Sequence, residues 1–474
     1  MKDKSIIKWL YGIIGKNRIN IVILIALQVI TGAMGVYYAI LLRDVIDNAV
    51  EKNKSQFFFY LVLVILIVLL QIILNALIRY FEEKSRSSIE NILKGNLFST
   101  ILKKDFESVN TTHSGEWLNR LTSDTVVVAN GIVEILPGFS GMVIKLIGAL
   151  VMILTIEPKF SYLIIPACLC IIGITYPFRK VLKRLHRNIQ EKDGKLRVFL
   201  QEHIENLMVV CSFATENQTA SEAYDRMDEH KKARMKKIRL SNICSIAFSA
   251  AMHGIYLLGM GYCGYGIINN TVSYGTLMTI LQLINQIQAP FANISGFLPK
   301  YYAVIASAER IIEASRFDDR FIEESKSCDE VYSFYNNKFK KFIFENAGFT
   351  YQPIGKSQDK SKMPVVLKNV NLEINKGDYV AFTGQSGCGK STMLKLLMCL
   401  YHLDEGEYLL SDNEGNEMKM SSKWSRFFSY VPQGNQLMSG TIREVITFSD
   451  KTKMKETEKI KTALKISCAD EFVD

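Results

Sequence analysis

The residues from Gly384 to Thr392, GQSGCGKST, have the types and spacing that polyphosphate binding requires. They fit the pattern G-x-x-x-x-G-K-[ST], in which glycines let backbone N–H groups converge on phosphate oxygens. Lys390 can reach the β and γ phosphates, and the Ser391 hydroxyl can ligate Mg²⁺. The motif therefore predicts a site for a nucleoside triphosphate and Mg²⁺, in preference to an ordinary glycine turn.

The segments around this motif are those that such a loop needs. The apolar stretch Tyr379–Thr383 precedes it, and the sequence STMLKLLMCLYHL (391–403) predicts a helix after it. Upstream, FIFENAGFTY (342–351) and VVLKNVNLEI (365–374) predict short strands. This order predicts an α/β P-loop nucleotide-binding domain in the last third of the chain.

The preceding 300 or so residues contain six stretches that are long and apolar enough to cross a bilayer, which takes about 20 helical residues. They are Ile19–Leu42, Phe57–Tyr80, Glu134–Ile156, Phe160–Phe178, Ile243–Ile267 and Tyr274–Ile294. Six such stretches are less consistent with buried helices of a soluble protein than with transmembrane helices. We predict an all-α domain of six transmembrane helices, in which packing against neighbours tolerates Pro166, Pro177 and Pro290.

Lys and Arg are concentrated in the two long loops at 81–130 and 179–240 and at the N-terminus, whereas the turn between spans five and six has none. This bias predicts that both termini and both long loops are cytoplasmic. Apolar residues at helical spacing in the loops predict helical extensions of the spans into the cytosol. The residues Ser5–Ile14 predict a short helix in the membrane interface.

Composition excludes several other classes of protein. The 474 residues are 48% hydrophobic and 22% charged, which excludes a disordered chain. The net charge of +10 follows from membrane topology and needs no nucleic acid. Nine scattered cysteines without a CxxC pair predict neither a disulfide framework nor a zinc site. The six histidines, His402 among them, have no partners in the sequence and read as ordinary polar positions.

The whole chain resembles a half-transporter of the ATP-binding-cassette (ABC) exporters. Beyond the motif at 384–392, AGFTYQP and SYVPQGNQLMSGTIREVI are similar to two segments of that family. The resemblance implies that Tyr351 stacks on adenine and that Gln433 joins Ser391 at Mg²⁺. The segment 103–125 resembles the stretch that carries the first coupling helix, and 205–216 resembles the stretch after the second coupling helix. The implied ATP-binding residues are Tyr351, Gly384, Gln385, Ser386, Gly387, Cys388, Gly389, Lys390, Ser391, Thr392 and Gln433.

The sequence also departs from the family pattern. After Gln433 there is no signature segment, no Walker B strand with its carboxylates, no D-loop and no switch histidine. We therefore expect a transmembrane domain at 1–312, a linker at 313–339 and a partial cassette at 340–474, without a catalytic residue. Either the sequence is a truncated product or fragment, or another chain supplies the missing half.

The resemblance implies ATP-driven export of an unidentified substrate by a dimer, in the cell membrane and without nucleic acid. The alternative is a nucleotide-responsive membrane protein that does not hydrolyse ATP, or an inactive remnant. Polar residues follow one stripe of the last span, namely Gln282, Asn285, Gln286 and Asn293. They could line a substrate path or hydrogen-bond between helices of a dimer. Cys388 in the loop reads as packing filler, with redox sensitivity as the second reading.

Overall fold

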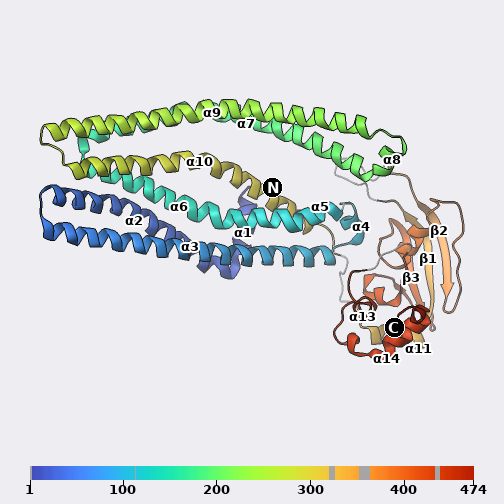
Figure 1. Cartoon of the computed structure of the whole chain (residues 1–474). Coiled ribbons are helices and arrows are strands. Elements are labelled where there is room, and N and C mark those ends of the chain that lie inside the picture. The colour runs from blue at the N-terminus through green and yellow to red at the C-terminus, as the bar shows by residue number, and fades with distance from the viewer. Residues whose placement is uncertain (1–2, 113, 320–325, 352–362, 433–437, 474) are drawn as a thin grey trace. The chain divides into compact units, whose positions relative to one another are not determined.

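The computed structural model describes residues 3–112, 114–319, 326–351, 363–432 and 438–473 (Figure 1). Within the helices, the side chains of most residues at 161–180 and 289–296 also lie outside the description. The chain forms two compact units. A helical unit comprises Met1–Leu102 and His113–Arg316, and a second unit comprises Lys103–Thr112 and Phe317–Asp474.

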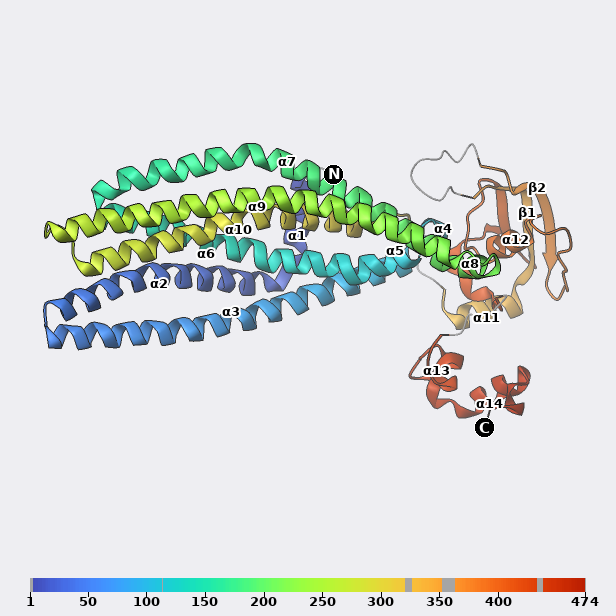
Figure 2. The same ribbon diagram turned by 45° about the horizontal axis from the view of Figure 1, so that its top comes forward.

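The helical unit consists of long helices that run alongside one another (Figures 1 and 2). Its elements are α1 (Asp3–Ile14), η1 (Gly15–Asn17), α2 (Arg18–Val50), α3 (Lys54–Lys103), α5 (Ser114–Asn119), η2 (Arg120–Asp124), α6 (Thr125–Ile156), α7 (Pro158–Glu205), α8 (Leu207–Ser212), α9 (Glu216–Ile268) and α10 (Tyr274–Ala314). Helix α6 packs against α2 and α10, and α7 pairs with α9. The predicted helical extensions are confirmed in α3, α7 and α9, each of which joins an apolar segment to a charged one within one helix.

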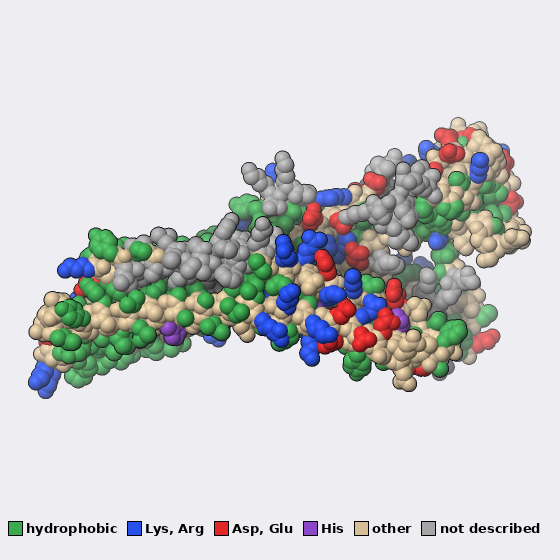
Figure 3. Space-filling view, turned by 90° about the horizontal axis from the view of Figure 1, so that it is seen from above, with side chains coloured by type: hydrophobic (Ala, Val, Ile, Leu, Met, Phe, Trp, Pro, Cys, Tyr) green, Lys and Arg blue, Asp and Glu red, His purple; other side chains and the backbone are tan. Residues whose placement is uncertain are grey.

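Four helical segments of the described chain are long and apolar enough to cross a membrane: Arg18–Val50, Lys54–Lys103, Ser114–Ile156 and Glu216–Ile268. The other two predicted spans lie in α7 and α10, which remain helical through Pro166, Pro177 and Pro290. Apolar side chains cover one end of the helical unit, and charged side chains gather towards its other end (Figure 3). This division matches a lipid-facing end and a water-facing end.

Small residues bring the helices of this unit into close contact. A Cβ atom built on Gly32 of α2 would lie 2.9 Å from the carbonyl oxygen of Gly141 in α6. Ala39 and Ala149 are fully buried in the same apolar cluster, together with Ile153 of α6. Such residues allow helix backbones to approach closely, which is the main source of packing between helices in lipid.

The second unit is built on a four-stranded antiparallel sheet in the order β2-β1-β3-β4. Its elements are α4 (Phe106–Asn110), α11 (Cys328–Asn337), β1 (Phe339–Phe349), β2 (Leu367–Asn375), α12 (Lys390–Leu397), β3 (Glu405–Asp412), β4 (Glu417–Lys419), α13 (Ile442–Thr447) and α14 (Thr457–Ile466). In the central strand, Phe344 faces Leu372 of β2 and Tyr408 of β3. The rings of Phe344 and Tyr408 stack with centroids 4.0 Å apart, which anchors the core.

Two predictions for this unit need correction. The expected strand at 379–383 does not form: the segment pairs with no strand among the described residues, and Tyr379 is fully exposed. A strand needs a neighbouring ladder, and an apolar run alone does not supply one. The expected helix at 391–403 ends at Leu397, because Cys399 takes a left-handed conformation with φ 53°. The chain then returns to β1, where the Asp404 N–H donates to the Gly348 carbonyl.

Candidate nucleotide-binding site

The loop that precedes α12 depends on its glycines. Gly384, Gly387 and Gly389 have φ angles of +147°, +85° and +96°, which other residues rarely adopt. Gly389 also forms the N-cap of α12, and a Cβ atom there would lie 2.9 Å from Cδ2 of Leu367. Any residue with a side chain at position 389 would therefore be strained in this loop conformation.

Helix α12 holds the loop against the sheet. Thr392, Met393, Leu396 and Leu397 are buried on one side of the helix, within the aromatic core of the unit. The opposite side and the helix N-terminus stay open. In the part of the chain that the structure describes, no group accepts a hydrogen bond from the N–H of Ser386, Gly387 or Gly389. Unused amides at a helix N-terminus form an anion-binding arrangement.

The ammonium group of Lys390 closes this arrangement. Its Nζ atom donates to the carbonyl oxygens of Gly384 at 2.9 Å and Gln385 at 2.8 Å, and lies 3.6 Å from Sγ of Cys388. A positive charge thus lies beside the unused amides. Left-handed glycines, free N–H groups and this ammonium fit a phosphate chain. Ser391 is exposed in the first turn of α12, whereas Gln433 lies outside the described residues.

Tyr351, predicted from the resemblance, lies directly beside the helix of this loop. Its hydroxyl and Oγ1 of Thr392 are 2.7 Å apart and share a hydrogen bond. The Tyr351 ring meets Phe349 and Tyr401 edge to face, with centroids 5.0 and 5.5 Å apart. Burial is the main cause that raises the pKa of Tyr401 to about 12, and the neighbouring Tyr351 adds to it, so this hydroxyl stays protonated. The structure therefore brings Tyr351 and the loop together from sequence positions far apart.

A second contact of this unit was not predicted. Asp105 caps α4, accepting hydrogen bonds from the backbone N–H of Ser108 at 3.1 Å and from its hydroxyl at 3.3 Å. The other oxygen of the same carboxylate lies 3.4 Å from Nε2 of His402. Phe106 meets Tyr401 edge to face at 5.9 Å. The reading of His402 as an ordinary polar position was wrong. The D-x-x-S cap is visible in the sequence, but its partner, about 300 residues away, is not.

Comparison with known proteins identifies the family. A model of the ABC transporter transmembrane region matches residues 21–291, more than half of the chain. The chain belongs to the ABC transporter family. A further model, described as ABC transporter, matches residues 367–473 and includes the loop at 384–392. One transmembrane region followed by one such segment confirms the predicted half-transporter arrangement of an ABC exporter, which is an integral membrane protein.

Several curated relatives are similar over most of this ABC transporter chain. A putative export ATP-binding/permease protein of Rickettsia typhi is 24% identical over 430 residues, 90% of this chain and 70% of the relative. An ATP-dependent permease of Candida albicans is 26% identical, over 80% of this chain and 54% of the relative. A multidrug resistance ABC transporter ATP-binding and permease protein of Lactococcus lactis is 23% identical, over 73% and 55% respectively.

The polar residues predicted on the last span take different positions in this transporter chain. Nε2 of Gln286 donates to the carbonyl of Gly35 in α2 at 2.7 Å, so this side chain joins two helices of one chain. Its Oε1 atom is buried and has no partner among the described groups. Asn285 is exposed and Gln282 is half-buried, whereas the side chain of Asn293 lies outside the description. The structure therefore gives Gln286 an interhelical contact within one chain.

Proposed function

We propose that this chain is a subunit of an ATP-driven exporter that binds Mg·ATP at residues 384–392. The observation that carries the proposal is the arrangement of unused loop amides around the Lys390 ammonium. A triphosphate would replace the carbonyl groups of Gly384 and Gln385 as the partner of that ammonium. Its negative charge would also meet the N-terminus of α12.

The remaining residues of the site would complete ATP recognition. Tyr351 is held by Thr392 beside α12, where its ring can stack on adenine. Ser391 is exposed and can ligate Mg²⁺, with Gln433 as the second metal contact. Bound Mg²⁺ would neutralise phosphate charge. Cys388 would contribute only its backbone N–H to the cradle, in exchange for the hydrogen bond that this N–H donates to the Gln385 carbonyl at 3.3 Å.

The proposed transport step is a population shift within a dimer. ATP binds the closed state of the cassettes better than the open state, and this difference in affinity moves the equilibrium of the transmembrane helices. Residues 1–474 contain neither a signature segment nor a Walker B carboxylate. A nucleotide-responsive membrane protein that exports nothing is the second candidate.

We place the protein in the cell membrane, and the distribution of Lys and Arg supports an orientation with both termini in the cytoplasm. The extended segments of α3, α7 and α9 carry many Lys and Arg side chains, and charged side chains gather at that end of the helical unit (Figure 3). Positive residues are retained on the cytoplasmic side during insertion. We further propose that six spans cross this membrane, that the transmembrane domain ends at residue 312, and that the partial cassette begins at residue 340.

Binding of Mg·ATP to the purified chain in lipid nanodiscs tests the function directly. Lys390→Ala should weaken binding by about 10- to 100-fold, since it removes a charge-assisted hydrogen bond. Lys395→Ala, five residues further along α12, removes an equal charge away from the loop and should leave affinity within about twofold. Equal loss in both variants, or no binding by the unaltered chain, would contradict the proposal.

A further inference from the structure

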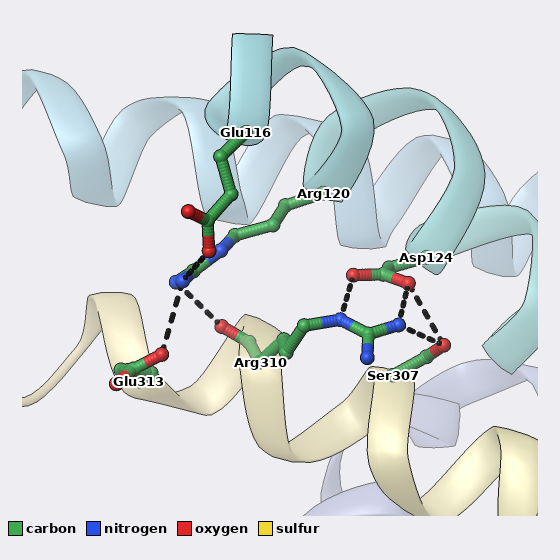
Figure 4. Close-up of polar contacts among 6 residues, drawn as sticks. All are labelled: Glu116, Arg120, Asp124, Ser307, Arg310 and Glu313. Carbon is green, nitrogen blue, oxygen red and sulfur yellow. Dashed lines mark hydrogen bonds and ion pairs between the residues drawn. The ribbon is translucent and has the colours of Figure 1, made fainter. Parts of the chain in front are cut away.

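A network of five charged side chains and one serine joins α10 to α5 and η2 in the helical unit (Figure 4). Its members are Glu116, Arg120, Asp124, Ser307, Arg310 and Glu313. We refer to these six residues as the α10 clamp. The first three come from the segment that leads into α6, and the last three from the final turns of α10.

One half of the clamp centres on Asp124. Its carboxylate accepts from Nε and Nη2 of Arg310 through its two oxygens, with 2.7 Å to Nε, and also accepts from the Ser307 hydroxyl at 2.8 Å. Only 3% of the Asp124 side chain is exposed. Two parallel hydrogen bonds between arginine and carboxylate fix both distance and angle. Asp124 therefore sets how the end of α10 lies against η2.

The other half centres on Arg120. Its guanidinium donates to the backbone carbonyl of Arg310 at 3.0 Å and to the carboxylates of Glu313 at 3.0 Å and Glu116 at 2.6 Å. The guanidinium also lies over the Trp117 ring, 4.7 Å from its centroid. With 4% of its side chain exposed, Arg120 links α5 to the last turns of α10.

The backbone of η2 is adapted to these contacts. Arg120–Asp124 forms a π-helix between α5 and α6, and both end residues are buried. π-Helical turns are rare and are frequently found at functional sites, where they displace side chains from α-helical register. Here the turn directs one basic and one acidic side chain towards the same neighbouring helix.

The clamp also occupies a special place along the chain. The chain passes between the two units at three points: after Leu102, after Thr112 and after Arg316. Glu116 and Arg120 follow the second crossing closely, and Arg310 and Glu313 closely precede the third. Two of the three covalent connections therefore run directly into the clamp.

Net stability is a poor explanation for this arrangement, in which Asp124 and Arg120 are buried while their partners Arg310 and Glu116 remain exposed. Desolvation cancels much of the attraction within a buried ion pair, and apolar residues of similar size often stabilise as well or better. Such a pair instead fixes the geometry between two segments, because its hydrogen bonds form or break together. The α10 clamp has this property at the connection between the units.

We propose that Arg120 and Asp124 are positioning residues that make the end of α10 and the α5–η2 segment move as one body. A displacement of the second unit on binding Mg·ATP would then reach α6 and α10 together. The inference rests on the proposed function, because it concerns how nucleotide binding is coupled to the transmembrane helices. Both residues belong to the helical unit, whereas the loop at 384–392 belongs to the second unit.

Hydrogen exchange of the full chain in nanodiscs, with and without Mg·ATP, tests the inference. In the unaltered protein, nucleotide should change exchange in both α6 and α10. Asp124→Asn keeps size and the Ser307 contact but removes the charge. It should leave the affinity for Mg·ATP within about twofold and reduce the response of α10 by about 2- to 30-fold. Arg310→Lys, which loses the paired hydrogen bonds, should act in the same direction.

Controls separate the possible failures. Glu191→Gln removes the exposed pair with Arg187 in α7 and should leave the response unchanged. If both clamp variants bind nucleotide and α10 responds as before, the inference is wrong. The same holds if the unaltered protein binds Mg·ATP without any change in α6 and α10. Absence of binding by the unaltered protein would refute the proposed function itself. A thermal scan of each variant identifies any that fails to fold.

Discussion

Nε2 of His402 lies 3.4 Å from Oδ1 of Asp105, so an ion pair joins α4 to the segment after α12 within the second unit. Burial would raise the pKa of Asp105, but hydrogen bonds from His402 and Ser108 outweigh it and hold that pKa below 3.8. The hydrogen bond to Asp105 outweighs desolvation and raises the pKa of His402 above 6.5, with Glu107 and Asp318 adding negative charge.

The docking of α4 should therefore depend on pH. The raised pKa of His402 stabilises the folded unit below pH 6.5, and this contribution is lost as pH rises through the folded value. The lowered pKa of Asp105 stabilises it above pH 3.8, and this contribution is lost as pH falls through the lowered folded value. Both contributions are present between these limits. Exchange of the α4 amides, corrected for intrinsic rates, should be about two- to fivefold faster near pH 8 than near pH 6.

Substitution of the histidine isolates this effect. His402→Gln should abolish the difference between the two pH values, because glutamine carries no titrating charge. His186→Gln, at an exposed position on α7, serves as the matched control and should retain the difference. If His402→Gln keeps the full pH dependence, another group is responsible.

The glycine at the start of α12 should be irreplaceable. Gly389→Ala places a methyl group in a left-handed conformation and 2.9 Å from Cδ2 of Leu367. We expect a loss of about 2 kcal/mol or more in the free energy of unfolding, and weaker binding of Mg·ATP. Gly377→Ala is the control, since its φ of +91° is similar but nothing lies within 4 Å. Equal losses in both variants would show that packing against Leu367 contributes nothing.

The left-handed glycine conformations of the loop at 384–392 could be predicted from sequence, because the pattern that requires them is local. The spacing of nine residues was enough to identify Gly384, Gly389 and Lys390, and the structure brings the Lys390 ammonium to the Gly384 carbonyl. The contacts of Tyr351 with Thr392 and of Asp105 with His402 join distant positions, so periodicity could not reveal them. The expected strand at 379–383 failed for a related reason, because an apolar run does not specify its hydrogen-bonding neighbour.

In the helical unit, too, local features could be predicted from the sequence and contacts between distant segments could not. Length and hydropathy predicted the helices, since each apolar run satisfies its backbone internally. The choice of neighbours was not predictable, because lipid-facing and helix-facing residues are equally apolar. Polar residues on α10 illustrate the limit: the stripe was visible, but only the structure shows Gln286 donating to Gly35 of α2.

The hydrogen bond between Tyr351 and Thr392 should couple the predicted adenine-binding residue to α12. Each of Tyr351→Phe and Thr392→Val removes one hydroxyl, and each should cost about 1 kcal/mol in the free energy of unfolding without nucleotide. In the double variant the losses should be less than additive, with a coupling of about 0.5–1.5 kcal/mol. Strictly additive losses would mean that the two hydroxyls act independently.

Asp47 at the end of α2 should hold the N-terminus of α10. Its carboxylate accepts from the Ser273 hydroxyl at 2.7 Å and from the backbone N–H of Gly275 at 2.8 Å. A negative charge at a helix N-terminus is stabilising, so Asp47→Ala should cost about 1–2 kcal/mol and speed amide exchange in the first turn of α10. Asp44→Ala, one turn earlier in α2, should leave that exchange unchanged. If the two substitutions accelerate exchange equally, the effect comes from net charge, and the contact with Gly275 is not what fixes α10 to α2.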